Sequence, residues 1–498
     1  MFFNKKKFYI TTSIPYTNAP PHIGHAFELI QTDVLARYYK NLAEDVFFLT
    51  GTDEHGLKTL RAAEATGKNT QEFADEISGK FRELARVLNI SNNDFIRTTD
   101  EKKHRPAVYK LWQKYMENGD IYKKKYKGFY CVGCEAFKTQ KELVGGKCAI
   151  HLKEVEVVEE ENYFFKLSKY LLKVKKIIET EKIKIIPESR KNEILGMIEQ
   201  GMEDVSFSRM EEKYWGWPVP EDPSQNLYVW LDALPNYISA LDYAGDQKKF
   251  KRYWPADVHC IGKDIVKFHA IYWPAMLLSA GLALPRQIFV HGFITANGQK
   301  ISKSLGNVID PFELVEKYGT DAVRYFLLRE IPPTEYGDFT YEKFEQRYNA
   351  DLAGGIGNLV ARVLGLASNI KYLRPRWIRL WRKISNRNRL LHSCNSAELS
   401  KNKNLKIKIE SVQKNYKKSL ENFRFNESLS LIWELVSYCD KYINEEKLWE
   451  TKNSEVVNDL FFTINEISIL LEPFLPETSE RIKMAVESRK KETLFPRI

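Results

Sequence analysis

The sequence predicts an α/β catalytic domain built on a parallel sheet, with a cysteine-containing insertion and an all-helical domain behind it. Three observations support this prediction. Short apolar strands alternate with amphipathic helices at the start of the chain and again in its middle, a pattern typical of parallel sheets. Between residues 118 and 220, lysines, glutamate runs and paired cysteines break the alternation. After Tyr341 the apolar residues follow the helical period, and no convincing strand remains.

The first fifty residues are expected to form a strand, a loop, a helix and a second strand. Phe8–Thr12 is short, aromatic and β-branched, and the proline-rich segment 13–21 follows it as a loop. His22–Asn41 carries apolar residues at helical spacing, and Val46–Leu49 is again a buried strand. Further strands are expected at Tyr228–Trp230, Val258–Ile261 and Ile288–Val290. Helices of a C-terminal bundle are expected at Asp351–Ala367, Ser411–Leu448 and Val456–Leu471.

These elements divide the chain of 498 residues into four segments. The predicted segments are residues 1–117 as the first half of the catalytic domain, 118–220 as the insertion, 221–345 as the second half of the catalytic domain, and 346–498 as the helical domain. At roughly one domain per 100–200 residues, the length agrees with such a division.

The composition excludes several classes of protein. Hydrophobic residues make up 43% of the chain and charged residues 29%, which argues against wholesale disorder. No stretch approaches the ~18 consecutive apolar residues of a membrane helix, and the N-terminus has no apolar region or cleavage site of a secretory signal. Six cysteines are too few for a disulfide scaffold. We therefore expect a cytoplasmic protein without a membrane partner.

The first candidate site is the sequence His22-Ile23-Gly24-His25 at the start of the first helix. A helix N-terminus presents unpaired backbone N–H groups to an anion, and Gly24 lets a nucleotide approach the backbone closely. The two imidazoles at i and i+3 lie on one helical face and can both donate to phosphate oxygens. The alternative is two unrelated histidines that cap a helix, and for four residues alone that alternative is favoured.

The second candidate site is the sequence Lys300-Ile301-Ser302-Lys303-Ser304, flanked by glycines. Two lysines in such a loop suit the transient charge of a leaving pyrophosphate, because nucleotidyl transfer depends on positioning and charge neutralisation. A solvated basic loop is the commoner origin of such a stretch. Each motif follows a predicted strand, and about 280 residues separate the two.

As a pair, the two motifs resemble the HIGH and KMSKS signatures of class I aminoacyl-tRNA synthetases, with Ile301 where the family has Met. This resemblance implies a Rossmann-like catalytic domain. Further blocks are similar to those of methionyl-tRNA synthetases, and the similarity extends from Phe8 to about Glu480. The blocks are Thr12–Tyr16, Thr50–Gly56, Tyr228–Ala233, and Ile261–Ile265 running on to His269.

The resemblance implies an enzyme that activates L-methionine with ATP and Mg²⁺ and transfers it to the terminal adenosine of tRNA(Met). The implied catalytic residues are His22, His25, Lys300 and Lys303, and the implied ATP-binding residues are His22, Gly24, His25 and Lys303. The implied methionine-binding residues are Ser13, Ile14, Tyr16, Asp53, Trp230, Ala233, Tyr237 and His269. Their chemistry agrees, because an apolar, aromatic pocket suits a flexible thioether and a carboxylate suits its ammonium group. Tyr16 or His269 is expected to donate to the sulfur. Taken singly, each aromatic is more commonly a core residue, and Asp53 equally suits a helix cap.

A zinc site is predicted in the insertion. Cys131-x-x-Cys134 is followed thirteen residues later by Cys148-x-x-His151, a spacing that suits one tetrahedral Zn²⁺. Because the protein fills all four positions, the metal is expected to be structural. The alternative is a set of unpaired buried cysteines. The pattern also resembles the single-knuckle branch of methionyl-tRNA synthetases.

The helical domain resembles an anticodon-binding bundle. The resemblance makes Trp449 a stacking platform for an anticodon base, whereas helical spacing alone favours a core residue. Asn349, Asn358 and Arg362 are further candidates for anticodon contacts. Residues 371–408 hold twelve lysines and arginines but one acidic residue, and a surface connector is favoured over an RNA-contacting arm. A monomer is expected because no appended dimerisation module is recognised.

Two alternative functions remain open from the sequence. One is another class I synthetase, although the short insertion leaves no room for a large editing domain. The other is a catalytically silent relative that binds tRNA or zinc. The intact residues His22, Gly24, His25, Lys300 and Lys303 argue against a silent relative.

Overall fold

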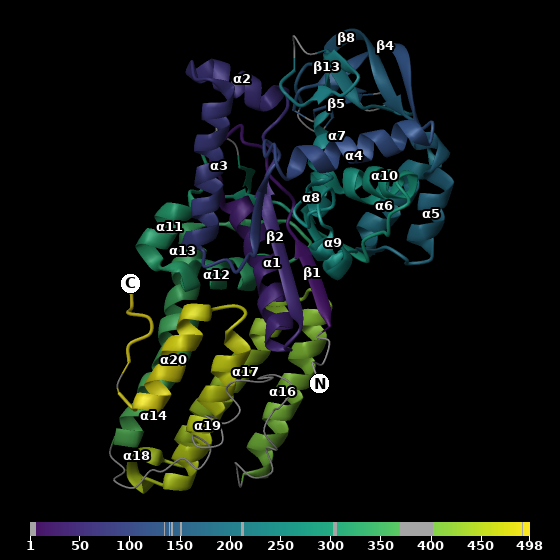
Figure 1. Ribbon diagram of the computed structural model, residues 1–498. Coiled ribbons are helices and arrows are strands. Elements are labelled where there is room, and N and C mark those ends of the chain that lie inside the picture. The colour runs from purple at the N-terminus through teal and green to yellow at the C-terminus, as the bar shows by residue number, and fades with distance from the viewer. Residues whose placement is uncertain are drawn as a thin grey trace.

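The computed structural model describes most of the chain. The described residues are 6–133, 135–138, 140, 143–149, 152–210, 214–301, 306–368, 402–490 and 492–498. Figure 1 shows the helical bundle at one end of the molecule and the strands of the insertion at the opposite end.

In the described part of the chain, six parallel strands form the central sheet. In spatial order they are β3 (Asp94–Arg97), β2 (Asp45–Thr52), β1 (Lys7–Thr11), β14 (Val258–Gly262), β15 (Gln287–His291) and β9 (Lys184–Ile186). The strands predicted at Phe8, Val46, Val258 and Ile288 are confirmed. Because all six run the same way, the residues that follow them gather at one edge of the sheet.

Alternate residues of the central strands face two different cores. Phe8 and Ile10 of β1 pack with the buried face of α1 (Ile23–Asn41), whereas Tyr9 between them packs on the other side of the sheet. This period of two is what the pleat of a strand imposes. The helices of the second face are α4 (His104–Glu117), α5 (Leu171–Glu179), α6 (Glu188–Glu199), α8 (Asn236–Ser239) and α10 (Trp273–Ser279).

The sequence prediction of a strand at Tyr228–Trp230 is wrong. The strand there, β13 (Asp222–Leu227), ends earlier, and Tyr228 is the N-cap of a short helix, α7 (Val229–Ala233). All of α7 is buried, so its sequence has no polar face that reveals the helical period. A short run of buried apolar residues does not distinguish a strand from a helix. Trp230 therefore lies on a helix, α7, and not on a strand.

The insertion is built from small antiparallel sheets. Its strands are β4 (Ile121–Cys131), β5 (Ala136–Lys138), β8 (Glu156–Phe165) and β10 (Val205–Ser206) in one sheet, β11 (Ser208–Met210), β12 (Pro218–Val219) and β13 in a second, and β6 (Leu143–Val144) with β7 (Lys147–Cys148) in a hairpin. Strand β9 also lies within residues 118–220 but joins the central sheet beside β15. The segment boundaries expected from the sequence stay a prediction.

The helical bundle follows the second half of the catalytic domain. Its elements are a π-helix η7 (Tyr348–Gly357), α14 (Asn358–Ser368), α16 (Lys403–Glu421), α17 (Phe425–Glu445), α18 (Leu448–Thr451), α19 (Ser454–Leu471) and α20 (Pro476–Ser488). The helix expected at Ser411–Leu448 is interrupted at Phe423, whose φ of 60° lies in the left-handed region. By length and composition, the helical run Tyr341–Ser368 is the one in the described residues that is apolar enough to cross a membrane, and half of its apolar window is buried inside the protein.

The segment between β15 and the bundle completes the catalytic half. It holds a small sheet of β16 (Ile294–Ala296), β17 (Gln299–Lys300) and β18 (Gly337–Phe339), and the helices α11 (Pro311–Tyr318), α12 (Thr320–Arg329) and α13 (Tyr341–Arg347). The N-terminal half adds α2 (Leu57–Thr66) and α3 (Thr70–Val87), and the middle of the chain adds α9 (Lys248–Tyr253) and the short turns η4 (Lys263–Ile265) and η5 (Phe268–Tyr272).

Candidate functional site

The segment that follows the second phosphate-type motif contacts the N-terminus of α1. The backbone N–H of Ile23 donates to the carbonyl of Ile309 at 3.2 Å. The amide of Asn307 donates to the carbonyl of Lys300 at 3.1 Å, so the chain that leaves β17 is tied back toward α1. Residues 302–305, which include the predicted Lys303, lie outside the described residues. The described contacts nevertheless join segments that are about 280 residues apart in the sequence.

His22 and His25 form a reciprocal cap at the start of α1. Nδ1 of His22 accepts from the N–H of Gly24 at 3.1 Å, and Nδ1 of His25 accepts from the N–H of His22 at 3.1 Å. The two rings stack with centroids 4.0 Å apart. A Cβ on Gly24 would lie 2.9 Å from the ring of His22, so the stack needs glycine here. The capping interpretation is therefore correct for both Nδ1 atoms.

The cap also sets the protonation of His25. Burial and the neighbouring His22 and His291 hold the pKa of His25 well below its usual value, so the ring is neutral at pH 7. Since Nδ1 accepts a hydrogen bond, the single proton is on Nε2. A neutral ring with an Nε2–H donor beside a helix N-terminus without acidic residues is suited to bind a phosphate oxygen.

Asp53 follows β2 as a buried carboxylate. It is 2% exposed, and among the described residues its Oδ1 atom has no hydrogen-bond partner. Its backbone N–H donates to the carbonyl of Pro15 at 2.8 Å, which sets it beside Tyr16. Burial, and then the charges of Asp232 and Glu135, raise the pKa of Asp53 well above its usual value. An unpartnered buried carboxylate is costly, and a cationic ligand would remove that cost.

Aromatic rings surround the space next to Asp53. Trp230 stacks on Phe268 with centroids 3.6 Å apart and meets the rings of Tyr16 and His269 edge-on, each at 6.4 Å. The hydroxyl of Tyr16 and Nε1 of Trp230 are buried, and neither has a hydrogen-bond partner in the part of the chain that the structure describes. The described structure thus brings together rings from the loop after β1, from α7 and from η5.

His269 is fixed as a neutral acceptor. Its Nδ1 lies 3.0 Å from the carbonyl of Ile265, which can only accept, so Nδ1 carries the proton. Nε2 then accepts from the hydroxyl of Tyr237 at 2.7 Å. Burial lowers the pKa of His269 to about 4, which agrees with a neutral ring. Because both nitrogens are engaged, Tyr16 is the better of the two expected donors to a sulfur.

The remaining residues predicted to bind methionine are Ser13, Ile14, Ala233 and Tyr237. The N–H and the hydroxyl of Ser13 donate to Oε1 of Glu28 at 2.7 and 2.6 Å. Ala233 and Tyr237 are buried on α7 and α8, and Ile14 is half-buried.

Sequence reasoning missed Glu28 and His291. Oε2 of Glu28 accepts from Nε2 of His291 at 2.8 Å, and this pairing raises the pKa of His291 against the effect of burial. Glu28 lines a cleft together with Thr12, Ser13, His25 and Gly51. The ion pair links α1 to the end of β15. Glu28 and His291 are 263 positions apart, and no local sequence pattern predicts that they pair.

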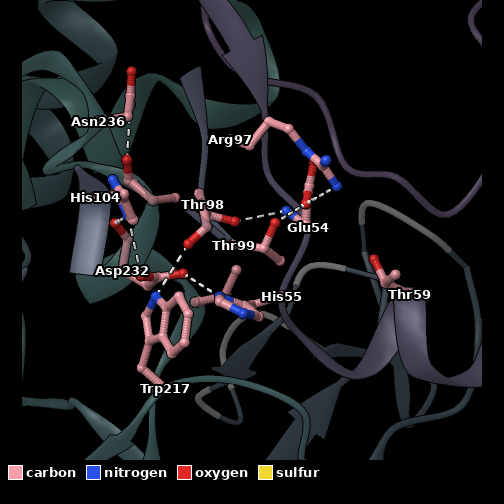
Figure 2. A network of polar contacts seen from close by, with 12 residues as sticks. Glu54, His55, Thr59, Arg97, Thr98, Thr99, His104, Trp217, Asp232 and Asn236 are labelled. Carbon is pink, nitrogen blue, oxygen red and sulfur yellow. Dashed lines mark hydrogen bonds and ion pairs between the residues drawn. The ribbon is translucent and has the colours of Figure 1, made fainter. Parts of the chain in front are cut away.

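A polar network fixes the chain just beyond Asp53 (Figure 2). The buried carboxylate of Glu54 accepts from Nε of Arg97 at 2.6 Å and from the hydroxyl of Thr99. Nδ1 of His55 lies 2.7 Å from Oδ2 of Asp232, whose Oδ1 lies 3.1 Å from Nε2 of His104. Asp232 follows Trp230 on α7, so the network ties the segment that follows Asp53 to the helix that carries Trp230.

Two of the four predicted zinc ligands are described. Cys131 ends β4 and Cys148 ends β7, and both side chains are buried. Cys131 directly precedes a turn in which Glu135 N–H donates to the carbonyl of Val132, and Leu152 N–H donates to the carbonyl of Cys148. Cys134 and His151 lie outside the described residues. Among the described residues alone, no cluster of three ligands is present.

The predicted anticodon residues lie on the bundle. Trp449 on α18 is 52% exposed, so it is not a core residue. Arg362 donates to Asp440 at 2.7 Å and to Asn444 at 2.9 Å, Asn349 is hydrogen-bonded to the C-terminal Ile498, and Asn358 is exposed. Most of the basic stretch 371–408 lies outside the described residues.

Comparison with known proteins gives family matches over most of the chain. The model of tRNA synthetases class I (M) matches residues 8–151 and 138–364, and the model of the anticodon-binding domain of tRNA ligase matches residues 402–495. The methionine–tRNA ligase of Thermotoga maritima is 42% identical over 496 residues, which cover 97% of this chain and 76% of that protein. That of Brucella suis is 40% identical over 490 residues, with 96% of this chain and 91% of that protein covered.

A solved structure is similar over nearly the same extent. Mycobacterium tuberculosis methionyl-tRNA synthetase in complex with methionyl-adenylate superposes with a TM-score of 0.86 at 38% sequence identity. The match covers 96% of this chain and 93% of that one.

Proposed function

The chain belongs to the methionine–tRNA ligases, a family of class I tRNA synthetases, and from this membership we propose how its own residues carry out the family's reaction. The carboxylate of L-methionine attacks the α-phosphate of ATP, which arrives with Mg²⁺, and methionyl-adenylate and pyrophosphate form. The terminal adenosine hydroxyl of tRNA(Met) then takes the methionyl group. The contact of Ile309, which follows the second motif, with Ile23 at the N-terminus of α1 is the observation that carries this proposal.

Asp53 and the aromatic pocket select the amino acid. The unpartnered Oδ1 of Asp53 would accept from the α-ammonium group of methionine. Trp230 and Tyr237 would surround the thioether chain, with Ser13, Ile14, Ala233 and His269 completing the walls, and the free hydroxyl of Tyr16 would donate to the sulfur. A pocket of this kind rejects charged and β-branched side chains by shape and by desolvation.

Charge develops at the α-phosphate and on the leaving pyrophosphate. The Nε2–H of His25, with His22, would stabilise the reacting phosphate, and Gly24 would let the nucleotide approach the backbone closely. Lys300 and Lys303 would neutralise the pyrophosphate as it leaves. No side-chain nucleophile is needed, because the substrate carboxylate is itself the nucleophile.

A structural zinc ion fits the insertion. Cys131 and Cys148 are buried next to turns of the chain, and the predicted ligands Cys134 and His151 would complete the usual set of three thiolates and one imidazole. Such an ion would stabilise the turns without taking part in the chemistry.

The bundle would bind the anticodon of tRNA(Met). An exposed indole on a short helix suits stacking with an unstacked base, as proposed for Trp449. We further propose a cytoplasmic monomer that acts without a membrane.

Amino-acid-dependent exchange of pyrophosphate into ATP tests this function. Methionine is expected to support exchange and cysteine and valine to fail, whereas the reverse result would favour another class I synthetase. Lys303→Ala is expected to lower kcat about 100-fold or more, because it removes a charge that acts on the transition state. Lys317→Ala, on the exposed face of α11, is the matched control and should match the wild type. A wild type without methionine-dependent exchange would support the silent relative instead.

A further inference from the structure

One residue of the insertion reaches into the catalytic half, next to the pocket proposed for methionine. Glu135 directly follows Cys134 in the sequence and is fully buried. Both oxygens of its carboxylate are engaged, one by the catalytic half and one by the insertion.

On the catalytic side, Glu135 caps the N-terminus of α2. Oε1 of Glu135 accepts from the backbone N–H of Lys58 at 2.6 Å, and the N-cap residue Gly56 supplies no side chain for this purpose. A Cβ on Gly56 would lie 3.0 Å from the same oxygen, and Gly56 has a φ of 109°, which favours glycine. A carboxylate at a helix N-terminus is stabilising, so the cap holds the first turn of α2 in place.

The capped turn bears directly on the pocket. The ammonium group of Lys58 lies 4.1 Å from the ring centroid of Tyr16, over its face. Lys58 also lies close enough to Asp53 to oppose the rise of its pKa. The position of this turn therefore determines where the ammonium group of Lys58 lies relative to Tyr16 and Asp53.

On the other side, Glu135 holds the helix that carries Trp230. The hydroxyl of Tyr228 donates to the backbone carbonyl of Glu135, and Tyr228 is the N-cap of α7. The hydroxyl of Tyr130 donates to Oε2 at 2.6 Å and anchors Glu135 to β4. One buried residue thus connects the Tyr16 wall of the pocket with the Trp230 wall, whose rings are 6.4 Å apart.

We propose that Glu135 is a positioning residue for methionine binding, which sets the spacing between the two walls of the pocket. The proposal rests on the proposed function. It implies that the insertion serves amino-acid recognition directly. Loss of the carboxylate leaves the Lys58 N–H and the Tyr130 hydroxyl buried without an acceptor, so the turn of α2 moves and the pocket widens.

Exchange kinetics at varied methionine and varied ATP test the proposal. Glu135→Ala is expected to raise the KM for methionine about tenfold or more and to leave the KM for ATP within about twofold. Glu135→Gln keeps an acceptor for Lys58 and gives Tyr130 an N–H partner, so it should stay within about threefold of the wild type. Glu156→Ala is the matched control, because Glu156 also joins the insertion to α2, through an exposed ion pair with Arg61.

A second variant covers the case in which Glu135→Ala does not fold. Tyr228→Phe removes only the hydroxyl that reaches the Glu135 carbonyl and is expected to raise the KM for methionine several-fold. Equilibrium titration with methionine should show the same loss of affinity without any reaction. The proposal is overturned if the folded variants keep a wild-type KM for methionine, or if the KM for ATP rises equally. A wild type that does not activate methionine overturns the proposed function and this inference with it.

Discussion

At the scale of single residues, the charge state of Asp53 links the pocket to pH. Its carboxylate is buried, and its pKa is raised well above the usual value by burial and by Asp232 and Glu135. A neutral acid cannot hold an ammonium ion strongly, so methionine binding has to ionise it. We therefore expect the Kd for methionine to fall as pH rises through the raised pKa, with one proton released per methionine bound.

Calorimetry in buffers of different ionisation enthalpy measures this proton release directly. Asp53→Asn should abolish it and weaken methionine binding about 100-fold or more, since a charge-assisted contact is lost. A proton release that survives in Asp53→Asn would assign the titration to another group.

The same residues show what a sequence can and cannot predict. Asp53 and Tyr16 could be placed together from the resemblance, because they belong to recognisable blocks at the ends of β2 and β1. The pairing of Glu28 with His291 could not, because it depends on how two distant segments meet. The tautomer of His269 likewise follows from the Ile265 carbonyl and the Tyr237 hydroxyl, which only the folded chain brings together.

At the scale of elements, α19 carries a buried acid that destabilises the bundle at high pH. Burial raises the pKa of Glu466 to about 7, from an ordinary value near 4.5, although the amide of Gln413 donates to it at 2.8 Å. Because the pKa is higher in the folded than in the unfolded state, protonated Glu466 contributes to the free energy of unfolding. This contribution is fully present below pH 4.5 and is lost as pH rises through about 7.

Glu466→Gln removes this titration without changing the shape of the side chain. At pH 8.5 the free energy of unfolding should rise by about 1–3 kcal/mol, whereas at pH 5 it should change little. Denaturant unfolding at the two pH values measures the difference. An equal effect at both would show that Glu466 does not titrate in this range.

The thermal stability of the insertion is expected to depend on bound zinc. A bound metal would contribute folding free energy to the turns near Cys131 and Cys148. Removal of zinc by a chelator should lower the Tm, and metal analysis should find about one zinc per chain. Cys131→Ser should lose the metal, while Cys260→Ser, in β14 of the central sheet, should keep it.

Helices and strands could be predicted where their apolar residues recur with the period of a helix or a strand. Helix α1 has a buried face that shows the helical period, and β1 alternates between two cores. Helix α7 was mistaken for a strand because all of its residues are buried, and the break at Phe423 depends on a left-handed backbone that the sequence does not signal.

At the scale of the whole molecule, one buried arginine joins the catalytic half to the bundle. Arg324 on α12 is fully buried, and its guanidinium donates to the carbonyls of Leu88, Pro473 and Phe474 and pairs with Asp33 at 2.8 Å. Residues 473 and 474 connect α19 to α20, whereas Asp33 belongs to α1, the helix that begins at His22. The orientation of the bundle is thereby tied to the helix proposed to bind ATP.

Arg324→Leu is expected to loosen this connection. It removes a positive charge that pairs with the buried Asp33 and leaves three buried carbonyls without their donor, so the free energy of unfolding should fall by about 3–5 kcal/mol.

The pocket and the α1 cap lie within the catalytic half, so methionine-dependent exchange should stay within about twofold of the wild type at low temperature. Transfer to tRNA requires the bundle and the catalytic edge to be held at a fixed separation, so kcat/KM for tRNA should fall about tenfold or more. Lys317→Ala, which removes an exposed ion pair and a contact with the ring of Tyr318, should change neither quantity. Equal losses in exchange and in tRNA charging would mean that Arg324 supports the catalytic half alone and does not set the position of the bundle.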